Sequence, residues 1–491
     1  MRTRILPRIG TQPTSNRGPN VYGSDKASRF ISDLASGTNS LDILLLGDSN
    51  TGSAIAGMWG YHQGFCEAMN GKGWTFYGTP LLSAMNGRNV NNAPDLWRGG
   101  INYFAPTGSL LSGNASGGST AYSVWSPTGN WTRYGSSTST PDSRDDWAYI
   151  SSATQYYQTF GMYINADNPL AAAGNTIYYR LRYGTFTASG GGFCPMVFNG
   201  GGTEQFSPRQ FQSSTGAAYS YNAWERSWTT AGTNSYRGSW SFVGTGSDVC
   251  KGPMAIANQS FYRRSKGWSI HSHAYLGGQS SDMIAATIKN SVPLTLMQTH
   301  LQEIRERQIL AGGTGRVLVM YQAGVNQSTG GIQETATKWV TAARDIWDTY
   351  KAAWVSLGYP LEDLACCFWC SHQINATDTS NPATVSGNMV AVRAAANQMA
   401  LDVPDMTVVD IKRLLNYTQL LMGTGDIGAA GNPVANNGKP YYQRISNWPN
   451  AGSDFYEHLS GGWTNTVGPV YHPTDGYTIM ANNILNALLS A

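Results

Sequence analysis

Five short apolar runs, separated by stretches of helical pattern, are the feature that most constrains how this 491-residue chain can fold. In chain order they are LDILLLG, GWSIHSHA, RVLVMYQA, LACCFWC and MTVVD. A run that is apolar at nearly every position is typical of a parallel strand buried on both faces of a sheet. Because helical patterns follow, over 291–313 and 335–358 among others, the order predicts βαβ units: an α/β fold with a parallel sheet flanked by helices.

Residues 106–265 interrupt this pattern. Short aromatic and β-branched runs alternate there with Gly, Asn, Ser and Pro, and no long helical period is present. Such spacing predicts an all-β, sandwich-like insertion, which would divide the α/β domain into 41–105 and 266–491. Its tryptophans either build the sandwich core or serve as platforms for sugar rings, so the insertion is also a candidate for glycan binding; they are Trp125, Trp131, Trp147, Trp224, Trp228 and Trp240.

Residues 1–40 are polar and rich in turn formers, including Gly10, Pro13, Gly18 and Pro19. We expect an N-terminal arm or linker there, and a candidate contact with a second copy of the chain or with a virion protein. The first residues include basic ones but no apolar segment, so no secretory signal peptide is expected.

Composition narrows the function classes. Charged residues make up 12% of the chain, the net charge is +3, and basic residues cluster no further than pairs such as Arg263-Arg264. A nucleic-acid-binding surface is therefore not indicated. No run reaches the ~18–20 apolar residues of a membrane span. Aromatic residues at 12% exclude a wholly disordered chain, which would need high charge and few aromatics.

The six cysteines do not form a pattern of known chemistry. Cys366, Cys367 and Cys370 fall in one apolar run, and no second C-x-x-C or Cys–His set has the spacing of zinc ligands. We therefore expect buried structural thiols. His271 and His273 alternate along an expected strand, and structural roles are favoured over metal binding for them too.

Polar residues gather where the expected strands end, which is where parallel α/β domains bind ligands. Ser49 lies at a strand-to-helix turn, where a hydroxyl can act as nucleophile. The backbone N–H groups of Ser49 and Gly278 and the side-chain amide of Asn326 could form an oxyanion hole with three donors. His472, before the last helix, would be the base that activates Ser49. These groups require no metal or cofactor.

The blocks GDSN, GGQSSD, AGVN and HP, in this order, resemble those of the SGNH (GDSL-type) hydrolases. That resemblance covers about 41–105 and 266–491, and it implies a flavodoxin-like fold and the activity of an esterase, such as a carbohydrate O-acetylesterase. It also implies the same four residues: Ser49, Gly278, Asn326 and His472. Viral haemagglutinin-esterases are similar in outline, because a β-rich lectin domain interrupts their SGNH domain.

The sequence departs from the family pattern beside the histidine. The family usually has Asp three residues before it, and here that position holds Pro469. A Ser49–His472 dyad would need only a backbone carbonyl to orient the imidazole; Asp454 and Glu457 are the alternative third members. Gln327 stands where the family often has Asp after the Asn, a position that supplies no oxyanion donor.

These observations predict a serine esterase that removes O-acyl groups, with acetyl favoured, from a polysaccharide or surface glycan. The low charge and the Gly-rich, aromatic texture fit a virion, a phage tail or an extracellular enzyme. The main alternative is a catalytically inactive glycan-binding or structural particle protein on the same fold, which Pro469 favours. A short-chain lipase or thioesterase is a third reading, disfavoured by the aromatic insertion.

Overall fold

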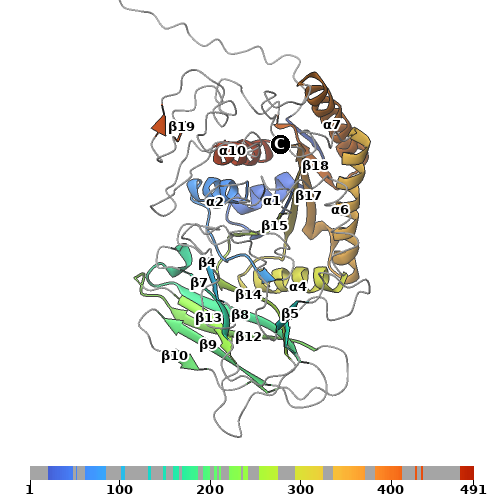
Figure 1. Ribbon diagram of the computed structural model, residues 1–491. Helices are drawn as coiled ribbons and strands as arrows, with labels where there is room; N and C mark the ends of the chain where they lie inside the picture. Colours follow the sequence, from blue (N-terminus) through green and yellow to red (C-terminus); the bar gives the residue numbers. More distant parts are fainter. Residues whose placement is uncertain are drawn as a thin grey trace, which may run out of the picture.

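In the computed structural model the chain forms one mixed sheet covered by helices and, beside it, two antiparallel sheets (Figure 1). The residues that the structure describes are 20–47, 51, 61–83, 101–104, 131–133, 148–150, 159–164, 168–185, 192–199, 204–206, 210–211, 220–233, 236–241, 254–274, 294–323, 335–370, 382–411, 426–427, 433–434 and 476–491.

The mixed sheet has six strands in the order β1-β18-β17-β16-β2-β15. They are β1 (Val21–Gly23), β2 (Leu41–Gly47), β15 (Trp268–Ala274), β16 (Val317–Ala323), β17 (Leu364–Cys370) and β18 (Met406–Val409). All pairs between β15 and β18 along this order are parallel, and β1 pairs antiparallel with β18. The predicted parallel sheet is thus confirmed. Counted along the chain, its parallel strands lie side by side as second, first, third, fourth and fifth.

Helices cover both faces of this sheet. On one face α1 (Lys26–Ala35) and α2 (Tyr61–Gly71) pack against α10 (Gly476–Leu489), and on the other α4 (Leu294–Leu310), α6 (Ala336–Ser356) and α7 (Pro382–Asp402) lie in sequence (Figure 1). The strands are apolar along their length because helices bury them on both faces of the sheet. Every residue of β2, for example, is buried. Short 3-10 turns are η2 (Pro169–Ala171) and η5 (Leu361–Asp363).

The expectation of an arm or linker over 1–40 is wrong for residues 20–40. β1 extends the mixed sheet, and α1 buries Ala27, Phe30, Ile31 and Leu34 in the core. These four positions follow the i, i+3, i+4, i+7 spacing of an amphipathic helix, a signal that the turn-rich residues before it obscured.

The cysteine prediction is confirmed for Cys366 and Cys367, which are buried in β17 with free thiols. Burial raises the pKa of both thiols, so they are poor nucleophiles. The side chain of Cys370 lies outside the described residues.

Across the described residues, no helix combines the length and the hydrophobicity that a membrane span requires.

The β-rich part contains two further six-stranded sheets, both antiparallel. One has the order β10-β9-β13-β7-β4, with β11 beside β9; the other has β12-β8-β14-β6-β5, with β3 beside β14. The strands are β3 (Leu82–Ser83), β4 (Ile101–Phe104), β5 (Trp131–Arg133), β6 (Ala148–Ile150), β7 (Thr159–Ile164), β8 (Thr176–Thr185), β9 (Gly192–Asn199), β10 (Glu204–Phe206), β11 (Gln210–Phe211), β12 (Ser220–Thr229), β13 (Tyr236–Ser241) and β14 (Met254–Arg263). A separate hairpin pairs β19 (Asp426–Ile427) with β20 (Pro433–Val434).

Aromatic side chains fill the space between the two antiparallel sheets. Trp228 of β12 lies with its ring centroid 6.3 Å from that of Tyr236 of β13, across the two sheets, and 6.3 Å from that of Phe261. Trp224 packs edge-on against Tyr179. Trp224 and Trp228 are buried, so both are core residues rather than sugar platforms.

The antiparallel pairing begins earlier than residue 106, where the texture of the sequence changes. β3 already pairs with β14, and β4 with β7. Such short strands carry too few residues for a recognisable period. The chain enters and leaves this region side by side: Tyr77 N–H donates to Trp268 O at 3.0 Å, and Arg263 N–H donates to Tyr77 O at 2.7 Å.

A cluster of buried charges joins the two parts. Along β8, Tyr179 faces the sandwich core, whereas Arg180 and Arg182 on the other face of the strand reach α4. Their Nε atoms donate to the two carboxylate oxygens of Glu303 at 2.6 and 2.7 Å, and both Nη2 atoms donate to Glu306. Burial alone would raise the pKa of Glu303, but the two guanidinium groups lower it.

We expect Glu303→Gln to lower the free energy of unfolding by about 3 kcal/mol, because the two guanidinium groups would lose the fully buried one of the two carboxylates that they share. Glu306→Gln is the matched control: its side chain is 37% exposed, so its loss is expected to stay below about 1 kcal/mol. Urea denaturation followed by circular dichroism measures both. Equal losses for the two variants would contradict the role assigned to Glu303.

Candidate functional site

Three neighbouring parallel strands end at the same edge of the mixed sheet, and each leads into one of the predicted blocks. β2 leads to Ser49, β15 to Gly278 and β16 to Asn326. The last residues of β2 and β15, Gly47 and Ala274, lie beside each other in register. The structure therefore brings the starting points of the three loops together at one edge.

The predicted residues themselves cannot be placed, because they fall outside the described residues. These are Ser49, Gly278, Asn326 and His472, with the alternative third members Asp454 and Glu457 and with Pro469. The roles of these residues remain predictions. The structure shows only the strands and the helix next to them in the sequence.

The end of β2 is joined directly to the end of β16. Thr51 Oγ1 donates to Gln322 Oε1 at 2.7 Å, and both residues are buried. A Cβ atom on Gly47 would lie 2.0 Å from Thr51 Oγ1 and 2.6 Å from the Gln322 carbonyl oxygen. No larger residue fits at this position without displacing them. Gly47 and Thr51, which flank residues 48–50 in the sequence, are thus held against the strand that precedes Asn326.

The start of α10, which follows His472, packs against α2. The rings of Tyr477 and Tyr61 meet edge to face with centroids 5.1 Å apart, and the Tyr61 ring lies 5.5 Å from that of Trp369 at the end of β17. Gly64 makes the helix contact close: a Cβ atom there would be 2.5 Å from the Tyr477 carbonyl oxygen. The helix that follows His472 in the sequence therefore begins near the end of β17.

A second polar cluster, which the sequence reading missed, lies wholly inside the protein under α4. Asp42 of β2 accepts hydrogen bonds from Tyr77 Oη at 2.6 Å, from Gln308 Nε2 at 2.6 Å and from Arg307 Nη2 at 3.1 Å. The sequence did contain a sign of this cluster. Asp42 lies inside the apolar run LDILLLG, and a carboxylate buried in such a run must be paired. Burial alone would raise the pKa of Asp42, but His271, Arg307 and Gln308 lower it.

His271 completes this cluster as a neutral side chain. Leu81 N–H donates to its Nδ1 at 3.0 Å, so the proton lies on Nε2, which donates to Asp42 Oδ1 at 2.8 Å. Burial lowers the pKa of His271, although Asp42 opposes the shift. Both side chains have no exposed surface. This acid–histidine pair is out of reach of a substrate, and its role is structural, as favoured from the sequence.

Among the side chains that can be placed, no three His, Cys, Asp or Glu residues are grouped as a metal site would require.

Comparisons with known proteins add little to this picture. No family model and no curated protein matches the chain. The solved structure of protein YXIM from Bacillus subtilis is similar over 58% of this chain and 76% of its own, with 12% identity and a TM-score of 0.21. A family 35 carbohydrate-binding module from Clostridium thermocellum (12% identity, TM-score 0.18) covers 27% of this chain and 86% of its own. A xylan-binding domain of family 22 (14% identity, TM-score 0.18) covers 28% and 89%. Function is therefore inferred from the chain's own residues.

We expect Gly64→Ala to destabilise the protein by about 1–3 kcal/mol, because the added methyl group forces α2 and α10 apart. Asn70→Ala, at an exposed position of the same helix, is the control and should change stability by less than about 0.5 kcal/mol. The two melting temperatures measure the difference. An unchanged melting temperature for Gly64→Ala would show that the close approach is not needed.

Acid should destabilise the protein through His62. Burial lowers the pKa of this histidine to about 4, and its Nε2 has no hydrogen-bond partner. Between pH 6.5 and pH 4 the unfolded chain therefore binds a proton that the folded protein does not. The free energy of unfolding should fall by up to about 1.4 kcal/mol per pH unit as the pH drops through this range.

His62→Gln removes this titration, so its stability should fall less steeply over the same range. Urea denaturation from pH 8 to pH 4 measures both slopes, and pH 8 serves as the reference at which the wild-type imidazole is neutral in both states. Parallel curves for the two proteins would disprove the assignment.

Proposed function

We propose that the chain is a serine esterase with a flavodoxin-like SGNH fold, and that it hydrolyses O-acyl esters, with acetyl favoured, on a polysaccharide. The observation that carries the proposal is the strand order. With the parallel strands arranged second, first, third, fourth and fifth, the connections from β2 and β16 run in opposite directions. A crevice for ligands opens at such a switch point in a doubly wound sheet.

The strands that precede the proposed nucleophile and one oxyanion donor, β2 and β16, lie on the two sides of that switch point. Ser49 follows β2 and Asn326 follows β16, and the Thr51–Gln322 hydrogen bond ties the two strand ends to each other. Gly278 follows β15, on the other side of β2. This neighbourhood supports the assignment of all three to one site.

In the proposed reaction Ser49 Oγ attacks the ester carbonyl carbon while His472 takes the hydroxyl proton. The oxyanion that forms would accept hydrogen bonds from the N–H groups of Ser49 and Gly278 and from the Asn326 amide, each typically worth about 3 kcal/mol of barrier. His472 then gives its proton to the leaving sugar oxygen. Water, deprotonated by the same histidine, releases the acid from the acyl-enzyme.

The group that orients His472 is part of the proposal. Asp42 is fully engaged in the cluster under α4 and cannot serve. We propose a Ser49–His472 dyad whose imidazole is held by a backbone carbonyl, with Asp454 or Glu457 as the alternative partner. The β-rich region would bind the glycan that carries the ester.

Pro469 favours one other function. Because it occupies the position of the family's usual Asp, a glycan-binding or structural protein on the same fold, without catalysis, is the second candidate. Such a protein would bind the polysaccharide and leave its esters intact.

Hydrolysis of p-nitrophenyl acetate tests the proposal. Ser49→Ala and His472→Ala should each lower kcat/KM by at least about 1000-fold, since each removes a member of the nucleophile–base pair. Ser356→Ala, at an exposed position of α6, is the control and should retain full activity.

Release of acetate from an acetylated xylan should respond in the same way. If the wild-type protein hydrolyses neither substrate, the esterase proposal fails and the binding protein is favoured. Asp454→Ala and Glu457→Ala should leave kcat nearly unchanged if the dyad operates, whereas a large loss for one of them would identify a third member.

A further inference from the structure

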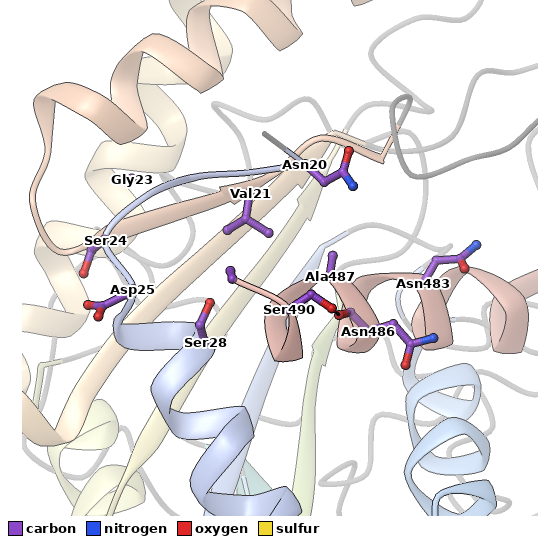
Figure 2. Close-up of a pocket in the computed structure, with 11 residues that line it drawn as sticks. Asn20, Val21, Gly23, Ser24, Asp25, Ser28, Asn483, Asn486, Ala487 and Ser490 are labelled. Atoms are coloured by element: carbon purple, nitrogen blue, oxygen red, sulfur yellow. Dashed lines mark hydrogen bonds between the residues drawn. The ribbon is translucent and has the colours of Figure 1, made fainter. Parts of the chain in front are cut away.

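A pocket of about 580 Å³ lies between β1, the start of α1 and the end of α10 (Figure 2). Volumes of this size are typical of sites for small molecules. On α10 the pocket is lined by the second half of the helix, from Asn483 onward, whereas His472 precedes the first residue of the helix in the sequence. With a rise of 1.5 Å per residue, Asn483, the lining residue nearest to the start of α10, lies roughly 10 Å along the helix axis from Gly476.

The pocket walls offer many uncharged hydrogen-bonding groups. Amide side chains come from Asn20, Asn483 and Asn486, and hydroxyl groups come from Ser24, Ser28 and Ser490. The single charged side chain in the lining is the carboxylate of Asp25. No described lining residue is a lysine or arginine, so the lining does not attract an anion.

Two lysines that neighbour the lining, one through a hydrogen bond to Asn486 and one in sequence beside Asp25, are already engaged. Lys72 Nζ donates to Asn486 Oδ1 at 2.6 Å, and Lys26 Nζ pairs with Asp405 at 2.6 Å. The lining therefore suits a neutral ligand that both donates and accepts hydrogen bonds.

Two polar atoms of the pocket lack partners within the protein. The Ser28 side chain is only 5% exposed, yet its Oγ makes no hydrogen bond. Figure 2 shows this hydroxyl directed from α1 into the space between β1 and α10. Asn483 Nδ2 is buried and also unpaired. Since burying a polar group without a partner is unfavourable, these atoms are placed for a ligand that satisfies them.

Other polar groups in the pocket are held by the protein. Ser24 Oγ accepts from Lys26 N–H at 3.2 Å, and Ser490 Oγ donates to Asn486 O at 2.8 Å. The side chains of Val21 and Ala487 add small apolar surfaces beside the polar ones. A sugar ring matches this mixture, because it carries hydroxyl groups around its edge and C–H groups on its faces.

We propose that this pocket binds one or two units of a neutral glycan, as a second carbohydrate site distinct from the proposed esterase centre. Ser28 Oγ and Asn483 Nδ2 form hydrogen bonds to sugar hydroxyl groups. The inference rests on the pocket alone and holds whether or not the chain is an esterase.

Saturation-transfer-difference NMR and calorimetry on the full chain test it, with cellotriose, xylotriose and maltotriose as neutral probes and trigalacturonic acid as the anionic one. At least one neutral trisaccharide should bind. Ser28→Ala and Asn483→Ala should each weaken that binding at least tenfold. Ser28→Ala should keep the wild-type melting temperature, because the hydroxyl it removes has no partner.

Ser36→Ala is the matched control, since Ser36 is an exposed serine at the opposite end of α1. Its affinity should equal that of the wild type. The proposal is overturned if no neutral trisaccharide binds, if the anionic probe binds as tightly, or if Ser28→Ala binds as the wild type does. Asn483→Ala keeps the test decisive should Ser28→Ala fail to fold. Because no esterase assay enters the comparison, failure here leaves the proposed function untouched.

Discussion

The structure depends on the charges that α4 holds inside the protein. Arg307 of this helix reaches Asp42 of β2 at 3.1 Å, and Glu303, one turn earlier, accepts hydrogen bonds from both guanidinium groups of β8. A buried carboxylate is tolerated only with complete pairing, so these contacts fix how the mixed sheet, the helix and the sandwich fit. One helix thereby fixes the β-rich region against the mixed sheet.

Much of the architecture could be predicted from the sequence, because burial on both faces leaves a plain trace in apolar runs such as those of β2 and β17. Elements without that trace were missed. α1 had the right spacing of Phe30, Ile31 and Leu34, but it follows turn-rich residues that resemble a linker. β3 and β4 are too short to show any period, and their pairing depends on β14 and β7, which lie far along the chain.

The loops that contribute to the candidate site could be predicted from the sequence, but their arrangement in space could not. Strand ends can be read from sequence, but which strands are neighbours is decided by long-range pairing. The structure supplies that pairing for the loops of Ser49, Gly278 and Asn326, while the side chains themselves lie outside the described residues. The pair of Asp42 and His271 shows that residue type alone does not identify a site. These two residue types are common in catalysis, but here they form a purely structural pair, because no solvent reaches them.

The paired entry and exit of the β-rich region affects its mechanics. Tyr77 is hydrogen-bonded to both Trp268 and Arg263, so the segments that enter and leave the β-rich region form a paired double connection to the α/β part. A domain on a single flexible linker swivels freely, whereas a double stem backed by buried ions resists both twisting and pulling. Force applied to the sandwich would therefore be transmitted directly into the mixed sheet.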